Sequence, residues 1–392
     1  MKLGLGLGLS AAQRQSNYEA ITADWMSWDG SNDGPITRLF SSGGTGGQDV
    51  VAISDGEAVL FWNTGAGEGK AVVLDVDNDL TFKSETTNTA LTLSISDPDG
   101  INIVTLTDTL LVALAEDNVS GLMECSLISK SGKVLAELGN ADTGVSAGAN
   151  FRNSLARLSN AQAVFVGREN NDSNHGRVGV IDASGGVLSV GALIDLNDGV
   201  GRFPSICRLT DNSFFVVTRQ KVHYCTVSGA TVTHVSSLDI DAAGTLYDDT
   251  MIGRVDDVTA LVAYEDGAGS QVHVNSFTWN GSAIIRGAPQ ADIFDGNNIF
   301  QGTGTVTALG NRQVMFSGRQ DDETPQFSAA VVCAVDEVGV ITVANRVQTS
   351  ANVTAGNAVI DVSPSGLYVF SAYLDGTTAP SQQIGTRILK GF

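Results

Sequence analysis

The sequence predicts an all-β fold, a seven-bladed β-propeller of four-stranded blades. The first observation is a phrase that recurs along the chain: an apolar residue, a small polar residue, Asp or Asn, and then a run of β-forming residues. Copies of the phrase, some of them loose, begin at Ile53, Leu106, Leu158, Leu209, Val255, Leu309 and Val362. The second observation is their spacing of 46 to 54 residues, which suits one four-stranded propeller blade. An ordinary β-sandwich would not explain seven copies at this spacing.

Each repeat contains the strands that such a blade needs. A short strand leads into the phrase and a second strand follows its turn, so the two form a hairpin. A third strand comes next, then a turn with Gly or Asp, and a fourth strand completes the unit. In the fourth repeat the first three strands are expected at residues 205–210, 214–219 and 222–227. The strands are often apolar on both sides, as in Phe214 to Val217, which is typical of sheets buried on both faces.

The seventh repeat lacks a fourth strand. Its third strand is expected at residues 384–389, and the sequence ends at Phe392. A propeller must close its ring, because an open sheet edge invites aggregation. We therefore expect residues 35–41 to supply the missing strand. This assignment divides the chain into an N-terminal extension, residues 1–34, and a propeller, residues 35–392.

Composition limits the partners. The chain has 43 acidic and 22 basic residues in 392, a net charge of −21, so its surface repels phosphate backbones and no nucleic-acid partner is expected. An acidic surface favours divalent cations, so calcium is kept as an option and no other cofactor is expected. No apolar stretch reaches about 18 residues, so we predict no membrane insertion. Cys125, Cys207, Cys225 and Cys333 form no CxxC pair and lie in apolar patterns, which predicts buried free thiols.

One column of the repeat is polar or charged where the second strand ends, ten residues after each anchor. Its members are Asn63, Glu116, Arg168, Arg219, Glu265 and Arg319. Propeller symmetry places them in a ring on one face. The favoured interpretation is ion pairing between blades, which fixes their register. The functional interpretation is a binding rim whose Arg forks receive carboxylates or sugar hydroxyls.

Two further groups of residues are candidates for binding. Tyr247 and Phe300 lie in loops expected on the face of the ring, where aromatic groups could stack on sugars or on partner side chains. A second column contains Arg157, Arg208 and Arg254, each one residue before its anchor in three consecutive repeats. For this column we expect structural pairing with acidic neighbours.

Catalysis finds little support in the sequence. The four histidines show no HExxH or His-x-His spacing, and no GxSxG elbow is present. The Ser-x-Asp-x-Gly-x-Thr-Trp boxes of sialidase-type propellers are missing, although Arg168, Arg219 and Arg319 could mimic the arginine triad of those enzymes. Paired carboxylates for glycoside hydrolysis stay open, because their separation in space is unknown. We therefore predict no catalytic and no metal-binding residues, with a glycosidase as the enzymatic alternative.

Residues 1–34 do not carry the repeat. Their apolar residues include Leu3, Leu5, Leu7 and Leu9, which alternate with glycine, and the close pair Trp25 and Trp28. The alternation has period two, which suits an extended strand. The tryptophans must be buried either against the chain's own body or against a partner protein, and both interpretations are open.

The opening Lys2-Leu3-Gly4-Leu5-Gly6-Leu7-Gly8-Leu9 resembles the Leu/Gly-rich N-termini of some tailed-phage virion proteins, including tail-fibre and appendage components. The propeller body, with Gly-, Ala-, Thr- and Val-rich strands, is similar in style to receptor-binding or decorating modules on virions. This resemblance implies a tail-fibre, spike or head-fibre component on the particle surface, present in several symmetric copies. Its N-terminal part would attach to other virion proteins, and its propeller would bind a host surface glycan or protein. A propeller glycosidase and a free bacterial propeller lectin are the alternatives.

Overall fold

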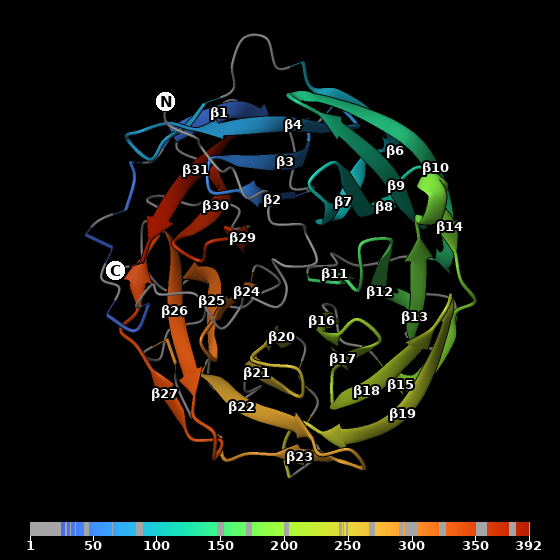
Figure 1. The fold of residues 1–392 in the computed structure, drawn as a ribbon, viewed down its shortest axis with the longest axis vertical. Helices are drawn as coiled ribbons and strands as arrows, with labels where there is room; N and C mark the ends of the chain where they lie inside the picture. The colour runs from blue at the N-terminus through green and yellow to red at the C-terminus, as the bar shows by residue number, and fades with distance from the viewer. Residues whose placement is uncertain are drawn as a thin grey trace, which may run out of the picture.

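The protein forms seven antiparallel sheets arranged as blades around a central axis, the predicted seven-bladed β-propeller (Figure 1). The computed structural model describes residues 25–27, 30, 31, 33–35, 37–42, 47–64, 66–83, 89–146, 153–169, 175–199, 204–242, 245, 247, 250–265, 271–289, 293, 294, 304–320, 327–349, 359–375 and 382–391. In blades 1 to 6 the strands run outward from the axis in sequence order.

The first three blades cover the N-terminal half of the ring. Blade 1 consists of β2 (Gln48–Ser54), β3 (Glu57–Asn63), β4 (Glu68–Val76), β5 (Phe82–Lys83) and β6 (Leu91–Ser96). Blade 2 consists of β7 (Pro98–Thr107), β8 (Leu110–Asp117), β9 (Leu122–Ser131) and β10 (Val134–Ser146). Blade 3 consists of β11 (Leu155–Arg157), β12 (Gln162–Glu169), β13 (His175–Asp182), β14 (Ser189–Val190) and β15 (Ile194–Gly199).

Blades 4 to 6 repeat this order. Blade 4 consists of β16 (Ser205–Thr210), β17 (Ser213–Val217), β18 (Lys221–Ser228) and β19 (Thr231–Asp239). Blade 5 consists of β20 (Thr250–Arg254), β21 (Thr259–Glu265), β22 (Val272–Trp279) and β23 (Ile284–Arg286). Blade 6 consists of β24 (Thr305–Gly310), β25 (Gln313–Gln320), β26 (Phe327–Val335), β27 (Ile341–Val343) and β28 (Val347–Gln348). In blades 1, 3 and 6 two short strands share the outer position.

Blade 7 joins the two ends of the chain. It consists of β29 (Val359–Val362), β30 (Tyr368–Asp375), β31 (Gln382–Lys390) and, from the N-terminal side, β1 (Thr37–Ser42). Strand β1 runs antiparallel to β31, with Thr37 opposite Thr386 and Ser42 opposite Gln382. The predicted closing strand is confirmed, and it extends one residue beyond the expected end.

The repeated phrase builds the turn between the first two strands of a blade. In five blades its small polar side chain accepts a hydrogen bond from the backbone N–H two residues further on. The acceptors are Ser54, Thr107, Ser159, Thr210 and Asp256, at 3.2, 3.3, 3.3, 3.4 and 3.0 Å. Short polar side chains stabilise tight turns in this way, which is why the phrase recurs at the end of the inner strand.

The core lies between neighbouring blades. Each of seven clusters of buried apolar side chains combines residues from two adjacent blades. Both faces of a blade are therefore covered, and in β17 every residue is buried. The four cysteines are free and buried in these layers, as predicted. No helix in the ranges given above is long and apolar enough to cross a membrane.

The described part of the expected extension packs on blade 7. The Trp25 side chain is fully buried among residues of blades 6 and 7, and its Nε1 donates a hydrogen bond to the Gly366 carbonyl at 2.9 Å. Asp33 Oδ1 accepts a bond from the Lys390 N–H, and the Gly34 N–H donates to Ile388. Trp25 thus follows the packing interpretation and contacts this chain's own body. Trp28 and the leucines at 3, 5, 7 and 9 lie outside the described residues.

Candidate functional site

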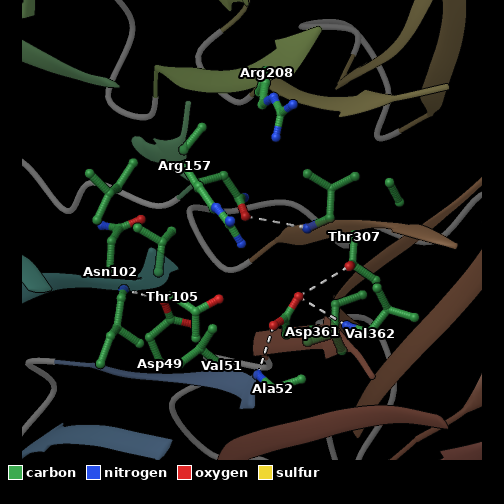
Figure 2. A pocket seen from close by; sticks show the side chains of 18 of the residues that line it. Asp49, Val51, Ala52, Asn102, Thr105, Arg157, Arg208, Thr307, Asp361 and Val362 are labelled. Carbon is green, nitrogen blue, oxygen red and sulfur yellow. Dashed lines mark hydrogen bonds between the residues drawn. The ribbon is translucent and has the colours of Figure 1, made fainter. Parts of the chain in front are cut away.

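The inner strands of the seven blades surround a central cavity of about 350 Å³ (Figure 2). Its wall contains residues of β2, β7, β11, β16, β20, β24 and β29. The volume lies in the range of pockets that take small ligands, roughly 300–1,000 Å³. The cavity is therefore the candidate functional site.

Two carboxylates of the wall connect neighbouring blades, as the dashed lines of Figure 2 show. Asp361, on β29, accepts hydrogen bonds from the N–H groups of Ala52 in blade 1 and of Val362, at 2.8 and 2.9 Å. Asp49, on β2, accepts the N–H of Ile103 in blade 2 at 2.8 Å. Burial raises the pKa of Asp361 to about 6. Both carboxylates bind backbone amides and hold blades together.

Asn153 crosses the cavity at the end where the inner strands begin. It lies two residues before β11 in blade 3, yet its Nδ2 donates to the Gly304 carbonyl in blade 6 at 3.3 Å, and its Oδ1 accepts from the Val306 N–H at 3.4 Å. Its carbonyl accepts the N–H of Ile206 in blade 4. The backbone φ of Asn153 is +50°, a conformation that Asn tolerates better than most residues. This bridge joins blades 3, 4 and 6 at the strand-start end of the cavity.

The three arginines of the second column line the opposite end of the cavity, which we call the arginine end. Arg157, Arg208 and Arg254 stand at equivalent positions on β11, β16 and β20. Each Nη2 donates to the turn residue three positions further on. The acceptors are Asn160, Asp211 and Asp257. The predicted acidic pairing is confirmed for Arg208 and Arg254, whereas Arg157 binds an amide oxygen.

The charge of the arginine end is uneven. Figure 2 shows the guanidinium groups of Arg157 and Arg208 extending from their strands toward the middle of the cavity. In the other four blades the same column holds smaller side chains. These are Ala52, Thr105, Ala308 and Asp361. Cations therefore gather along blades 3, 4 and 5, opposite small side chains and one carboxylate.

The predicted ring column lies at the other end of the blades. Antiparallel pairing places the end of the second strand beside the start of the first, as with Val217 opposite Ser205. Members of the column stand at or just beyond the ends of second strands, and none of those whose side chains the structure describes lines the cavity. They are Asn63, Glu116, Arg168, Arg219, Glu265 and Arg319. For one member an inter-blade contact is clear: Asn63 Nδ2 donates to the Pro98 carbonyl of blade 2 at 3.0 Å.

Glu116 has a carboxylate neighbour that the sequence analysis missed. Asp99 stands directly opposite Glu116 where β7 pairs with β8. Burial raises the pKa of Glu116 to about 7, and the charge of Asp99 acts in the same direction. Near neutral pH a large fraction of Glu116 is therefore protonated, opposite Asp99.

The predicted loop aromatics do not form a binding surface in the described part of the chain. Tyr247 is buried between blades 4 and 5, with its ring 4.6 Å from that of Tyr264. Its hydroxyl donates to Asp241 Oδ2 at 2.8 Å, and burial together with this carboxylate raises the pKa of Tyr247. Tyr247 thus packs between blades, while Phe300 lies outside the described residues.

Metal ligands do not gather in the residues for which the structure gives positions. Among them, no group of three or more His, Cys, Asp or Glu side chains is arranged to hold a metal ion. Two histidines of blade 4 lie close together. His223 Nδ1 lies 3.2 Å from His234 Nε2, and His223 Nε2 lies 3.3 Å from Asp198 Oδ2. These contacts satisfy a buried histidine.

The roles of Asp361 and Asn153 in the cavity wall were not predicted from the sequence, because their partners lie far away in the chain. Asp361 belongs to the same column as the three arginines, so its position was visible in the sequence. Its role in joining blades 7 and 1 was not visible, because Ala52 lies at the far end of the chain. Asn153 lies in an irregular segment that no repeat position marks, and its partner belongs to blade 6.

Comparison with known proteins supports the fold. No protein-family model matches the chain, and no curated protein matches it. A protein from Lactobacillus plantarum is 13% identical, with a TM-score of 0.55 over 84% of this chain and 94% of its own. A hypothetical selenium-binding protein from Sulfolobus tokodaii is 9% identical, with a TM-score of 0.57 over 84% and 90%. A Bacteroides fragilis protein provisionally described as a 6-phosphogluconolactonase is 12% identical, with a TM-score of 0.52 over 84% and 94%.

At these identities the likeness shows the β-propeller fold alone. Proteins described as enzymes are among the neighbours, so the fold itself does not argue against catalysis.

Proposed function

We propose that the chain is a non-enzymatic binding component of a phage virion. Its propeller would bind a host surface glycan or protein, and the residues before Trp25 would attach it to other virion proteins. The Leu/Gly alternation from Leu3 to Leu9 supports the attachment, because it resembles the N-termini of virion proteins of tailed phages. The propeller supplies a rigid scaffold, on which binding residues commonly sit.

One observation carries the choice of binding over catalysis. Asp49 and Asp361, two carboxylates of the cavity wall, accept hydrogen bonds from backbone amides of neighbouring blades. A general base must reach a proton of the substrate, whereas these oxygens serve the closure of the ring. Three arginines contribute the positive charge of the wall. Such a wall is better suited to holding a ligand than to transforming it.

The attachment is tested by a pull-down against purified particles or structural proteins from the same source. The full chain is compared with a chain that begins at Trp25, because Trp25, Asp33 and Gly34 bind blade 7 and must be kept. The full chain should bind, and the shortened chain should not. Equal thermal unfolding of the two chains is the control for folding. Binding by both chains, or by neither, would refute attachment through residues 1–24.

Glu116 and Asp99 favour a glycosidase as the second candidate. A carboxyl group with a pKa of about 7 beside a carboxylate resembles the acid and base or nucleophile that glycoside hydrolysis requires. This candidate predicts release of reducing sugar from a polysaccharide, lost in both Glu116→Gln and Asp99→Asn. Turnover that survives both substitutions would remove these residues from the mechanism.

A further inference from the structure

The geometry points to a binding site for an acidic sugar at the arginine end of the central cavity, with Arg157, Arg208 and Arg254 receiving its carboxylate. This inference rests on the proposed binding function and names the class of ligand. Nothing in the repeat requires arginine here, because four blades place Ala, Thr or Asp at the same position and still form the same hairpin. The three arginines are therefore not required for the structure of the blades.

The arginines are oriented before a ligand arrives. Each guanidinium is held at Nη2 by a residue of its own turn, which fixes the side chain in one direction. Arg254 is held a second time, by Nε donating to the Leu209 carbonyl of blade 4 at 3.1 Å. Side chains fixed in this way lose less rotamer entropy on binding. The planar fork of a guanidinium also matches the geometry of a carboxylate.

The local electrostatics favour an anion although the whole molecule is acidic. The side chains of Arg208 and Arg254 are 17% and 19% exposed, whereas their partners Asp211 and Asp257 are 72% and 73% exposed. Water therefore screens the carboxylates more than it screens the cations. The wall also contains the carboxylates of Asp49, Asp108 and Asp361, but the three guanidinium groups lie together along blades 3, 4 and 5, and an anion at this side of the cavity meets them.

The wall also fits the rest of a sugar. The cavity of about 350 Å³ is much larger than a phosphate or sulfate ion needs. Opposite the arginines the small side chains of Ala52, Thr105 and Ala308 leave room for a ring, and Thr105 brings a hydroxyl group that can bond to sugar hydroxyls. Pockets that bind a ring with one charged group combine such apolar and polar surfaces. A monosaccharide with a carboxylate meets these requirements.

The bridge at Asn153 and the arginines lie at opposite ends of the cavity. Asn153 joins blades 3 and 6 at the strand-start end, whereas the arginines stand where the inner strands finish. The carboxylate then lies near the arginine end, and the sugar ring extends between the inner strands. The ring column with Glu116 lies at the other end of the blades and takes no part in this contact.

Titration calorimetry of the full chain with sodium D-glucuronate and with D-glucose tests the inference. We expect glucuronate to bind about 10-fold or more tightly than glucose, because hydrogen bonds to charged groups are stronger than neutral ones. Arg208→Met should weaken glucuronate binding about 10-fold or more and leave the weak binding of glucose unchanged. The glucuronate affinity of Arg208→Lys, which keeps the charge and loses the fork, should lie between the affinities of the wild type and of Arg208→Met.

Arg177→Met provides the matched control. Arg177 lies on β13, its Nη1 is 3.1 Å from Asp195 Oδ2, and its side chain is 23% exposed, but it does not line the cavity. Glucuronate affinity should be the same in this variant as in the wild type. If Arg208→Met fails to fold, the comparison of Arg208→Lys with Arg177→Met decides.

Several results would overturn the inference. They are equal affinity for glucose and glucuronate, no glucuronate binding, unchanged affinity in both Arg208 variants, or inorganic phosphate binding as tightly as glucuronate. Particle attachment without glucuronate binding would refute this inference alone. Glucuronate binding without particle attachment would refute the virion role and keep the site.

Discussion

Glu116 shows how surroundings set the protonation of a single residue. Its pKa in the folded protein is about 7, against an ordinary value of 4.5, because of burial and the charge of Asp99. The folded state therefore holds this proton more tightly than the unfolded chain does. The stability that the group contributes is complete below about pH 4.5 and is lost as the pH rises through 7.

Replacing Glu116 by Gln should remove this pH dependence. Between pH 4.5 and 8, the free energy of unfolding of the wild type should fall relative to that of Glu116→Gln, and urea unfolding across this range measures the difference. Asp99→Asn should move the decline to lower pH, because the pKa of Glu116 then loses one of its two causes. If the free energies of unfolding of the wild type and of Glu116→Gln change with pH in parallel, the raised pKa of Glu116 is contradicted.

The environment of Trp25 allows a quantitative prediction of the free energy of unfolding. Trp25→Ala removes a fully buried indole and should lower the free energy of unfolding by about 3–5 kcal/mol. Trp25→Phe keeps most of the apolar contact but leaves the Gly366 carbonyl without its donor, which should cost about 1–3 kcal/mol. Denaturant unfolding measures both values. An alanine variant as stable as the wild type would place Trp25 outside the core.

At the scale of elements, the closing segment, residues 25–42, decides whether the ring is complete. A chain that begins at residue 43 lacks β1 and leaves the edge of β31 exposed. Exposed edges pair with other chains, so this variant should unfold at a lower temperature and form dimers or aggregates. A chain that begins at Trp25 is the control, and size-exclusion chromatography with thermal unfolding distinguishes the two. A stable monomer from residue 43 onward would contradict the role of the segment.

How far an element could be predicted from sequence depends on where its contacts lie. Strand β16 has the bounds expected from the pattern, Ser205–Thr210, because it is buried on both faces and ends in a turn that its own residues stabilise. The division of the outer strand of blade 6 into β27 and β28 was not predicted, because half-exposed strands carry a weaker apolar pattern.

The candidate site was harder to predict than the strands. The column of Arg157, Arg208 and Arg254 and the acidic pairing of two of its members were visible as local spacing. Their position around one cavity follows from the closure of the seven blades into a ring. The repeat predicts this closure, but it does not predict the dimensions of the cavity. Contacts such as Asn153 with blade 6 join segments far apart in the chain, and no local pattern encodes them.

At the scale of the whole molecule, the net charge of −21 opposes compaction. Raising sodium chloride from about 0.02 M to about 0.5 M shortens the range of this repulsion and should raise the unfolding temperature. The same salt should weaken glucuronate binding, because it screens the arginines too. Thermal unfolding and calorimetry in the same buffers separate the two effects. An unfolding temperature that falls with salt would show that surface ion pairs outweigh the repulsion.

The pairing of β1 with β31 has a consequence for synthesis of the protein. About 340 residues separate Ser42 from its partner Gln382. At roughly 5–20 residues per second, β1 leaves the ribosome about 20–70 s before β31 exists. Blades 1 to 6 can assemble during translation, but β1 can pair with β31 only after β31 has been translated. A nascent chain therefore carries an unpaired strand through most of its synthesis, which makes this strand a target for chaperones and a point where neighbouring nascent chains can exchange strands.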